Sequence, residues 1–346
     1  MSSLYPATID SETQLDQVLT DPSPELVATI RNLSSPLVMI GASGKMGPSL
    51  ALMAKRAAEA AGHPLEIVAA SRFSNQDTAA WFEAHGIRTQ QVDMLTRSSV
   101  QRLPKSENVL YLVGMKFGTS ADPSPTWVTN TLSPMLAAEH FAGARVVALS
   151  TGNVYPMTRL DYGGSRESDS LTPIGEYPNA AVARERLFEY FSRQFHSPLT
   201  NVRLNYAHDL RYGVLSDIAY KVYHDLPVDV SMGYFNAIWQ GDANNYILRC
   251  FDLCTVPATA INLTSRKVYS HRKVAELFGL YFGKVPQILG LEQDTALLSN
   301  TDFLLEKLGP ERLEGDLLIK WIANWMKIGG RLLGKPTHFE IRDGKF

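Results

Sequence analysis

The sequence predicts an α/β fold, in which a Rossmann-like, doubly wound parallel sheet carries a smaller C-terminal substrate-binding region. Three observations predict it. A short apolar run leads directly into three glycines spaced three residues apart, Gly41, Gly44 and Gly47. An alanine-rich helical pattern follows from Pro48 to Ala61. Apolar, strand-like runs then alternate with helical patterns as far as Asn205, as is typical of a parallel sheet with helices on both faces.

The glycines mark a dinucleotide-binding turn between the first strand and the first long helix. Gly41 permits the tight turn, Gly44 lets the backbone approach a pyrophosphate, and Gly47 lets the helix pack close to the strand. The free N–H groups at the helix N-terminus favour phosphate. A glycine triplet alone is weak evidence, but here a strand precedes it and a helix follows. We therefore expect cofactor contacts from the whole turn, which comprises Gly41, Ser43, Gly44, Lys45, Met46 and Gly47.

The elements of the first 205 residues follow from apolar runs and from the residues that interrupt them. Gly62 and Pro64 end the first long helix, and Gly86 ends the next. Strands are expected at 36–40, 65–70, 87–92, 108–114, 145–150 and 200–205. Helices are expected at 25–33, 48–61, 79–85, 127–141 and 181–196.

Beyond Asn205 the pattern becomes less regular. Helices are expected at 217–224, 242–253, 271–283 and 312–327, residues 228–239 look aromatic and loop-like, and 260–264 is expected to return as a strand. The expected organisation is an N-terminal extension (1–34), a Rossmann domain (35–205, with the returning strand near 260–265), a substrate-covering region (206–330) and a tail (331–346).

Composition excludes several classes of function. The 346 residues allow a sizeable core, and a net charge of −2 gives no reason to expect a nucleic acid or an anionic membrane as partner. No apolar run reaches the ~18 residues of a membrane span, and the first ten residues do not resemble a secretion signal. Cys250 and Cys254 are expected to be buried thiols rather than metal ligands, and no metal site is expected. The default expectation is a cytoplasmic protein.

The ordered motifs resemble the extended short-chain dehydrogenase/reductase family, the NAD(P)-dependent sugar epimerases and dehydratases, over roughly residues 36–327. The resemblance implies a cofactor-binding fold, hydride transfer on a sugar or nucleotide-sugar, and a homodimer formed through the fourth and fifth helices. The matching positions, in chain order, are the glycine triplet, Asp93, Asn130, the run Ser150-Thr151-Gly152-Asn153-Val154-Tyr155, Tyr177, Arg203-Leu204-Asn205, and Asp302 with Leu308-Gly309.

The resemblance implies catalysis by a hydroxyl, a phenol and a lysine. Thr151 falls on the hydroxyl position and Tyr177 on the phenol position, while Asn153 and Asn205 fall near the expected substrate. Four residues after Tyr177, where the lysine of the family belongs, this chain has Ala181. A phenol without a cationic neighbour has a pKa near ~10 and is a poor base at neutral pH. Either another cation assists, or Tyr177 does less than the resemblance implies.

Two basic residues are candidates to replace the missing lysine. Lys116 follows the fourth strand and has a flexible stem, so we favour it as the third catalytic residue. Arg184 shares a helix face with Tyr177 if one helix includes both. The alternative is that both are ordinary solvated charges.

Cofactor choice depends on the end of the second strand. NAD-binding proteins place a carboxylate there, whereas this chain has Ser71 and Arg72, which favours a 2′-phosphate and hence NADP over NAD. The resemblance implies that Asp93 and Met94 bind the adenine end. It implies that the nicotinamide lies near Val113, Gly114, Thr151 and Tyr177.

Several of these residues could instead have purely structural roles. Tyr177 could be a helix-entry aromatic, Thr151 a turn cap, Arg72 a solvated charge, and Asn130 or Asp242 a structural residue. The alternative to an enzyme is a non-catalytic dinucleotide-binding sensor that has lost the catalytic lysine.

Overall fold

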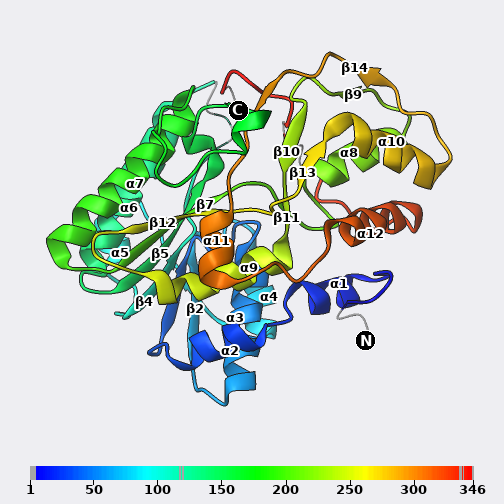
Figure 1. Ribbon diagram of the computed structural model, residues 1–346. Coiled ribbons are helices and arrows are strands. Elements are labelled where there is room, and N and C mark those ends of the chain that lie inside the picture. Colours follow the sequence, from blue (N-terminus) through cyan, green and yellow to red (C-terminus); the bar gives the residue numbers. More distant parts are fainter. Residues whose placement is uncertain (1–4, 117, 119–120, 335–336, 338, 345–346) are drawn as a thin grey trace.

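A seven-stranded parallel sheet forms the centre of the protein, in a computed structural model that describes residues 5–116, 118, 121–334, 337 and 339–344 (Figure 1). The strand order is β12-β7-β5-β4-β1-β2-β3. The predicted doubly wound α/β sheet is confirmed, and the strand expected to return near residues 260–265 is its seventh member. The strands are β1 (Leu37–Ile40), β2 (Ile67–Ser71), β3 (Arg88–Gln91), β4 (Asn108–Tyr111), β5 (Arg145–Thr151), β7 (Leu199–Leu204) and β12 (Thr259–Leu263).

The strand order reverses between β1 and β4, which are neighbours in the sheet. The chain runs outward from β1 to β2 and β3, then crosses back to β4 and continues in the other direction. In sheets of this type, ligands bind outside the carboxyl ends of the strands at the point of reversal. The segments after β1, β4 and β5 therefore define the expected site.

Alternate residues of the strands build two cores, one on each face of the sheet. Leu37 and Met39 of β1 belong to one core, and Val38 and Ile40 belong to the other. Both faces of the sheet are therefore covered. This explains why β1 is apolar at every position, since a strand buried on both sides has no face that contacts water. The first core is completed by α2 (Pro24–Arg31), α3 (Gly47–Ala61), α4 (Gln76–Ala84) and α9 (Gln240–Arg249). The second is completed by α5 (Arg97–Val100), α6 (Ser124–His140) and α7 (Glu176–Phe195).

A third core lies in the second half of the chain, beside the carboxyl edge of the sheet (Figure 1). Its helices are α8 (Val214–Tyr223), α10 (His271–Phe282) and α12 (Gly315–Lys327). Short strands connect them, namely β8 (Ala207–His208), β9 (Val228–Asp229), β10 (Tyr234–Asn236), β11 (Ile238–Trp239), β13 (Val268–Ser270) and β14 (Ile288–Leu289). Part of the N-terminal extension, α1 (Glu12–Leu19), also packs into this core through Leu15 and Leu19.

Several predicted boundaries were wrong. Helix α7 begins at Glu176 rather than at 181, so Tyr177 and Pro178 lie in its first turn, where proline is tolerated. The segment 228–239, expected to be loop, contains three short strands. Three helices were missed, α1, the short α5 and α11 (Asp302–Leu308).

Candidate functional site

The glycine turn between β1 and α3 is shaped by close backbone packing at two of its three glycines. Gly41 has φ +83°, and a Cβ there would lie 2.9 Å from a side-chain carbon of Val113. A Cβ at Gly47 would lie 1.8 Å from the carbonyl oxygen of Ala42. At Gly44 the nearest atom is the carbonyl oxygen of Gly41, at 3.2 Å. Gly41 and Gly47 are therefore required by the packing of the fold. At Gly44 only the Gly41 carbonyl oxygen is close, so the rest of the space around this residue is open to a ligand.

This turn fits a dinucleotide pyrophosphate. Helix α3 begins at Gly47 with Met46 as its N-cap, and no side chain caps it. The Gly47 N–H donates to the Gly44 carbonyl at 3.1 Å and Pro48 has no N–H, so it is chiefly the positive end of the helix dipole that favours an anion here. A cavity of about 330 Å³ lies against the turn and is lined in part by Ser43, Gly44 and Lys45.

The predicted cofactor residues of the turn differ in where their side chains lie. Met46 is buried in the core, so only its backbone faces the turn. The Lys45 ammonium donates to the carbonyl of Ala207 at 3.3 Å and lies 3.6 Å from the ring centroid of Tyr212. Lys45 therefore reaches toward the second half of the chain.

The end of β2 lies beside this turn. The hydroxyls of Ser43 and Ser71 are 2.5 Å apart, so the two serines form one hydroxyl pair at the edge of the sheet. Arg72, the next residue, is exposed. No carboxylate occupies the end of β2, as the sequence indicates.

Asp93, after β3, is engaged within its own turn. Its carboxylate accepts hydrogen bonds from the Leu95 N–H and the Thr96 hydroxyl, each at 3.0 Å. Met94 is buried in the second core. These contacts give Asp93 a structural role, and its predicted contact with adenine stays a prediction.

The end of β4 carries an arginine that comes from α7. Arg184, which is 3 % exposed, donates from one terminal nitrogen to the Val113 carbonyl at 3.1 Å and to the Asn130 side-chain oxygen at 2.7 Å. Asn130 in turn donates to the carbonyls of Met115 at 3.2 Å and Thr126 at 2.8 Å. Arg184 and Asn130 thus hold the backbone that leaves β4.

Lys116 lies two residues beyond Gly114 and is half-buried. Burial lowers the pKa of its ammonium to about 8. Its predicted catalytic role stays a prediction.

Thr151 ends β5, and its hydroxyl accepts a hydrogen bond from the Asn153 N–H at 3.2 Å. This is the turn-capping contact that the sequence left open, and the hydroxyl proton remains to be donated elsewhere. Tyr177 is 8 % exposed in the first turn of α7. Ala181, one turn later, is fully buried against Val154 and Tyr155. That it stands where the family has a lysine stays a prediction.

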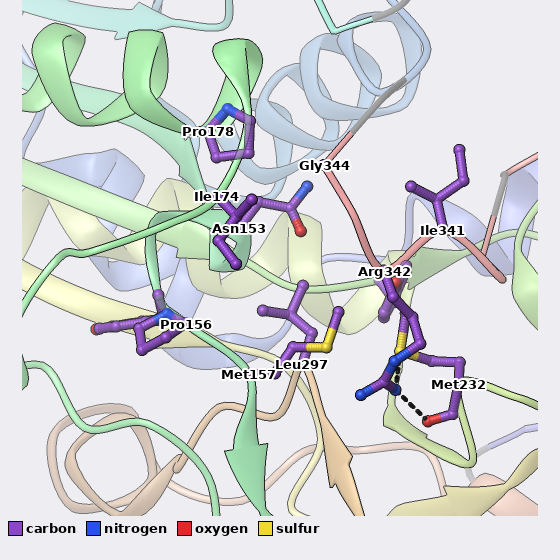
Figure 2. Close-up of a pocket in the computed structure, with 12 residues that line it drawn as sticks. Asn153, Pro156, Met157, Ile174, Pro178, Met232, Leu297, Ile341, Arg342 and Gly344 are labelled. Atoms are coloured by element: carbon purple, nitrogen blue, oxygen red, sulfur yellow. Dashed lines mark hydrogen bonds between the residues drawn. The ribbon is translucent and has the colours of Figure 1, made fainter. Parts of the chain in front are cut away.

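A small pocket lies beside these residues (Figure 2). Figure 2 shows Asn153 and Pro178 on one side of it, and Arg342 with Met232 on the other. Arg342 donates to the Thr295 carbonyl at 2.8 Å and to the Thr295 hydroxyl at 2.6 Å. The lining also includes Tyr155, Pro156, Met157, Ile174, Tyr206, Leu297, Ile341 and Gly344.

Asn205, predicted to face substrate, is buried beneath Gly152. Its amide nitrogen donates to the Asn236 side chain at 3.0 Å and to the Leu297 carbonyl at 3.3 Å. A Cβ at Gly152 would lie 3.0 Å from that of Asn205. Asn205 supports the backbone of the site, and a contact with substrate stays a prediction.

A buried ion pair fixes the elements around the pocket. Arg203 on β7 bonds Glu185 on α7 at 2.8 Å and the Tyr155 hydroxyl at 2.6 Å. Tyr155 also donates to Asn262 on β12 at 2.9 Å. This network was not predicted from the sequence, because Glu185 belongs to none of the matched motifs.

Within the described residues no helix is long and apolar enough to cross a membrane. The same residues contain no group of three or more His, Cys, Asp or Glu side chains placed to hold a metal ion.

Comparison with known proteins gave one family and many similar folds. Residues 37–207 match the NAD dependent epimerase/dehydratase family. No curated protein matches the chain.

Among solved structures, the UDP-glucose 4-epimerase of Thermus thermophilus with NAD is 14% identical with a TM-score of 0.68, and the match covers 84% of this chain and 99% of that one. MoeE5 with UDP-glucose and NAD is 16% identical with a TM-score of 0.67, covering 86% and 99%. The dTDP-glucose 4,6-dehydratase of Bacillus anthracis with NAD is 12% identical with a TM-score of 0.72, covering 85% and 97%. At these identities the likeness establishes the fold.

Proposed function

Because residues 37–207 of the chain belong to the NAD dependent epimerase/dehydratase family, we propose that the protein is an NAD(P)-dependent enzyme acting on a sugar or nucleotide-sugar. The proposed reaction is a hydride transfer at a carbinol or carbonyl carbon. The neighbouring structures include complexes of similar folds with NAD and UDP-glucose, which supports this substrate class.

The observation that carries the proposal is the shape of the glycine turn. The close packing of Gly41 and Gly47, the clear outer side of Gly44, and the N-terminus of α3 without a side-chain cap suit a pyrophosphate. Thr151 ends β5, which is the neighbour of β4 in the sheet, and Tyr177 lies in the first turn of α7. A cofactor held by the turn would extend along the edge of the sheet toward them.

In the proposed reaction the cofactor supplies hydride transfer, and side chains of the protein supply proton transfer and orientation of the substrate. When bound, the nicotinamide accepts a hydride from the carbinol carbon or returns one to a carbonyl. Tyr177 takes the hydroxyl proton of the carbinol, and the Thr151 hydroxyl orients the substrate oxygen. Asn153 lines the pocket, which supports the proposal that it bonds a sugar hydroxyl. Lys116 remains a candidate for the cationic role.

We propose NADP rather than NAD as the preferred cofactor. The Ser43 and Ser71 hydroxyl pair and the exposed Arg72 can donate to a 2′-phosphate, and β2 ends in Ser71 and Arg72 rather than in a carboxylate that would accept from a ribose 2′-hydroxyl.

The substrate pocket needs to open for a nucleotide-sugar. Its volume in this structure is about 50 Å³, whereas pockets for small molecules are typically about 300–1,000 Å³. Ile341, Arg342 and Gly344 occupy one side of it, so a shift of this segment would enlarge the pocket.

A homodimer through α6 and α7 is also proposed. Val128 on α6 and Tyr190 on α7 are 41% and 56% exposed, which supports an apolar contact on this face. Sedimentation of the protein tests the dimer, and a monomer at all concentrations would contradict it. The cytoplasmic location stays a prediction.

The proposed function is tested by cofactor binding followed by turnover. Protein fluorescence is titrated with NADPH and NADH, and cofactor absorbance is then followed with a panel of UDP- and dTDP-sugars. Tyr177→Phe is the matched control, since it should bind cofactor but lose turnover.

Binding without turnover on any sugar would favour the non-catalytic sensor, which the loss of the lysine makes the second candidate. Failure to bind either cofactor would contradict both.

A further inference from the structure

The C-terminal end of the described chain forms one wall of the small pocket shown in Figure 2. Ile341, Arg342 and Gly344 line the pocket, and Figure 2 shows them together on one side of it. We call residues 339–344 the strap. It runs from Phe339, which belongs to the third core, to Gly344, which contacts the residue preceding α7. The strap therefore connects the third core to α7 and lines the proposed substrate pocket between them.

The start of the strap is anchored in the third core. Phe339 is 2 % exposed, and its ring stacks on that of His271 of α10, with 5.0 Å between the centroids and 17° between the planes. The ammonium of Lys221, on α8, lies 4.9 Å from the centroid of the Phe339 ring. Just before the strap, the Thr337 N–H and hydroxyl donate to the Asp217 carboxylate of α8 at 2.8 and 2.5 Å. Apolar burial and these polar contacts fix this end of the strap to α8 and α10.

The far end of the strap is held by an arginine that bonds uncharged groups. Arg342 donates to the Thr295 carbonyl at 2.8 Å, to the Thr295 hydroxyl at 2.6 Å and to the Met232 carbonyl at 3.4 Å. Thr295 begins the short strand β15 (Thr295–Ala296). Because Arg342 is only half-buried, water can compete with these acceptors for its guanidinium.

Two glycines meet where the strap reaches α7. Gly344 has φ +75°, and a Cβ there would lie 2.1 Å from the Ile174 carbonyl oxygen. A Cβ at Gly175, which has φ +103°, would lie 2.5 Å from the carbonyl oxygen of Gly344. Both obstacles are backbone atoms, so the two segments approach this closely only because neither glycine has a side chain.

The pocket that the strap closes is too small for a nucleotide-sugar. Its volume is about 50 Å³, whereas pockets for small molecules are typically about 300–1,000 Å³. The wall that includes Tyr155 cannot recede, because its hydroxyl donates to Asn262 at 2.9 Å and accepts from Arg203 at 2.6 Å within the sheet. The far end of the strap is held by contacts that water can replace, so its movement is the easiest way to open the pocket.

We propose that the strap is an autoinhibitory latch on the substrate pocket, closed in this structure by Arg342 and Gly344 and opened when this end swings away from α7 about the anchored Phe339. The inference rests on the proposed function, because it takes the pocket to be the sugar site. If a nucleotide-sugar binds only when the strap is open, its apparent affinity is reduced in proportion to the open fraction. By the same linkage, a bound nucleotide-sugar favours the open strap.

A lid that closes over bound substrate would behave in the opposite way. Loosening such a lid would weaken binding of the nucleotide-sugar, and a bound nucleotide-sugar would hold the strap in place. The closed strap leaves about 50 Å³, so the structure favours a latch that has to open.

Trypsin cleavage after Arg342 measures release of the strap directly. Trypsin has to take the arginine side chain into its specificity pocket, and in the closed strap that side chain is engaged with Thr295. The loss of residues 343–346 from the native protein is followed by mass spectrometry of the intact chain. When opening is fast relative to cleavage, the cleavage rate reports the open fraction.

Gly344→Ala should release the strap without removing Arg342. Its methyl group would meet the Ile174 carbonyl oxygen, so cleavage after Arg342 should become at least about tenfold faster. Gly334→Ala is the matched control, because Gly334 lies in the same tail with φ +64° and nothing lies within 4 Å of a Cβ there. The control carries the same kind of backbone strain and should leave the cleavage rate unchanged.

Binding of UDP-glucose and dTDP-glucose in the presence of NADPH shows whether the strap closes the sugar site. Two released variants are compared with the parent protein: Gly344→Ala, and a chain truncated after Ile341, which keeps the Phe339 anchor. Each should bind at least one of the two nucleotide-sugars about tenfold more tightly than the parent. The nucleotide-sugar that binds should also speed trypsin cleavage after Arg342 in the parent protein.

Unchanged cleavage in Gly344→Ala, or equal acceleration in Gly334→Ala, would overturn the inference. Unchanged or weaker binding in the released variants would also overturn it, as would slower cleavage in the presence of a bound nucleotide-sugar. If the released variants bind NADPH but neither nucleotide-sugar, the strap does not close a sugar site and the inference fails. Failure of the parent protein to bind NADPH or NADH would instead contradict the proposed function, on which cleavage in the absence of ligand does not depend.

Discussion

Substitutions at Gly44 and Gly47 should separate the cofactor role of the glycine turn from its structural role. A methyl group at Gly47 would lie 1.8 Å from the Ala42 carbonyl oxygen, a backbone atom that cannot rotate away. Ordinary carbon–oxygen contact is about 3.4 Å, so α3 and the turn would have to separate by roughly 1.5 Å. At Gly44 the nearest atom is 3.2 Å away, so the neighbour needs to yield only a few tenths of an ångström.

These geometries predict that Gly47→Ala loses stability and that Gly44→Ala loses cofactor affinity. Overpacking of the kind expected at Gly47 lowers the free energy of unfolding by about 1–3 kcal/mol or more. The better helix propensity of alanine returns at most about 1 kcal/mol at Gly47. We therefore expect Gly47→Ala to lose about 2 kcal/mol of stability, seen as a fall of several degrees in Tm. Gly44→Ala should keep its Tm but lose at least tenfold in cofactor affinity, about 1.4 kcal/mol, because its methyl meets the pyrophosphate.

Thermal unfolding and titration with NADPH measure both quantities on the same samples. Unchanged affinity in a folded Gly44→Ala would refute the assignment of this turn to the cofactor. An unchanged Tm in Gly47→Ala would refute the close-packing argument.

Three further predictions concern single side chains. Arg72→Glu should weaken NADPH more than NADH by about 1.5–3 kcal/mol in fluorescence titrations, and an equal loss for both would rule out contact with the 2′-phosphate. Arg203→Met should cost about 3–5 kcal/mol in denaturant unfolding because it leaves Glu185 buried and unpaired; the exposed-pair control Arg88→Met should cost less than about 1 kcal/mol, and equal costs would contradict this. Burial raises the pKa of Asp242 to about 6, so the folded state binds this proton more tightly than the unfolded chain, and the group's contribution to stability falls as pH rises from about 4 to about 6. Asp242→Asn should therefore gain Tm relative to the parent protein more at about pH 7 than at about pH 4, and a gain independent of pH would contradict the reasoning.

Most of the sheet was predictable because its buried strands are apolar runs in the sequence. Residues 37–40 and 67–70 are buried on both faces and apolar throughout, and Pro36 and Gly41 bound the first run. Strand β3 is polar and half exposed, so its signal is weaker. Helix α1 was missed because it buries only Leu15 and Leu19 and is otherwise polar, although Ser11 caps it. Pro178 obscured the start of α7, since a proline in a first turn resembles an interruption.

The site was predictable only as far as its motifs are local. The glycine turn and the run from Thr151 to Tyr155 each lie in one continuous segment, so their motifs can be recognised in the sequence. The place of Arg184 depends on how α7 packs against β4 and α6, which spacing along α7 does not reveal. Likewise, Arg342 reaches Thr295 from 47 residues away, a contact that leaves no pattern in the sequence.

The close fit of Gly114 and Arg184 constrains how this chain can evolve. While Arg184 is present, every other residue at 114 would place a Cβ 2.6 Å from its terminal nitrogen. A lysine at 181 would meet the packed Val154 and Tyr155. We therefore expect residues 114, 181 and 184 to change together rather than one at a time.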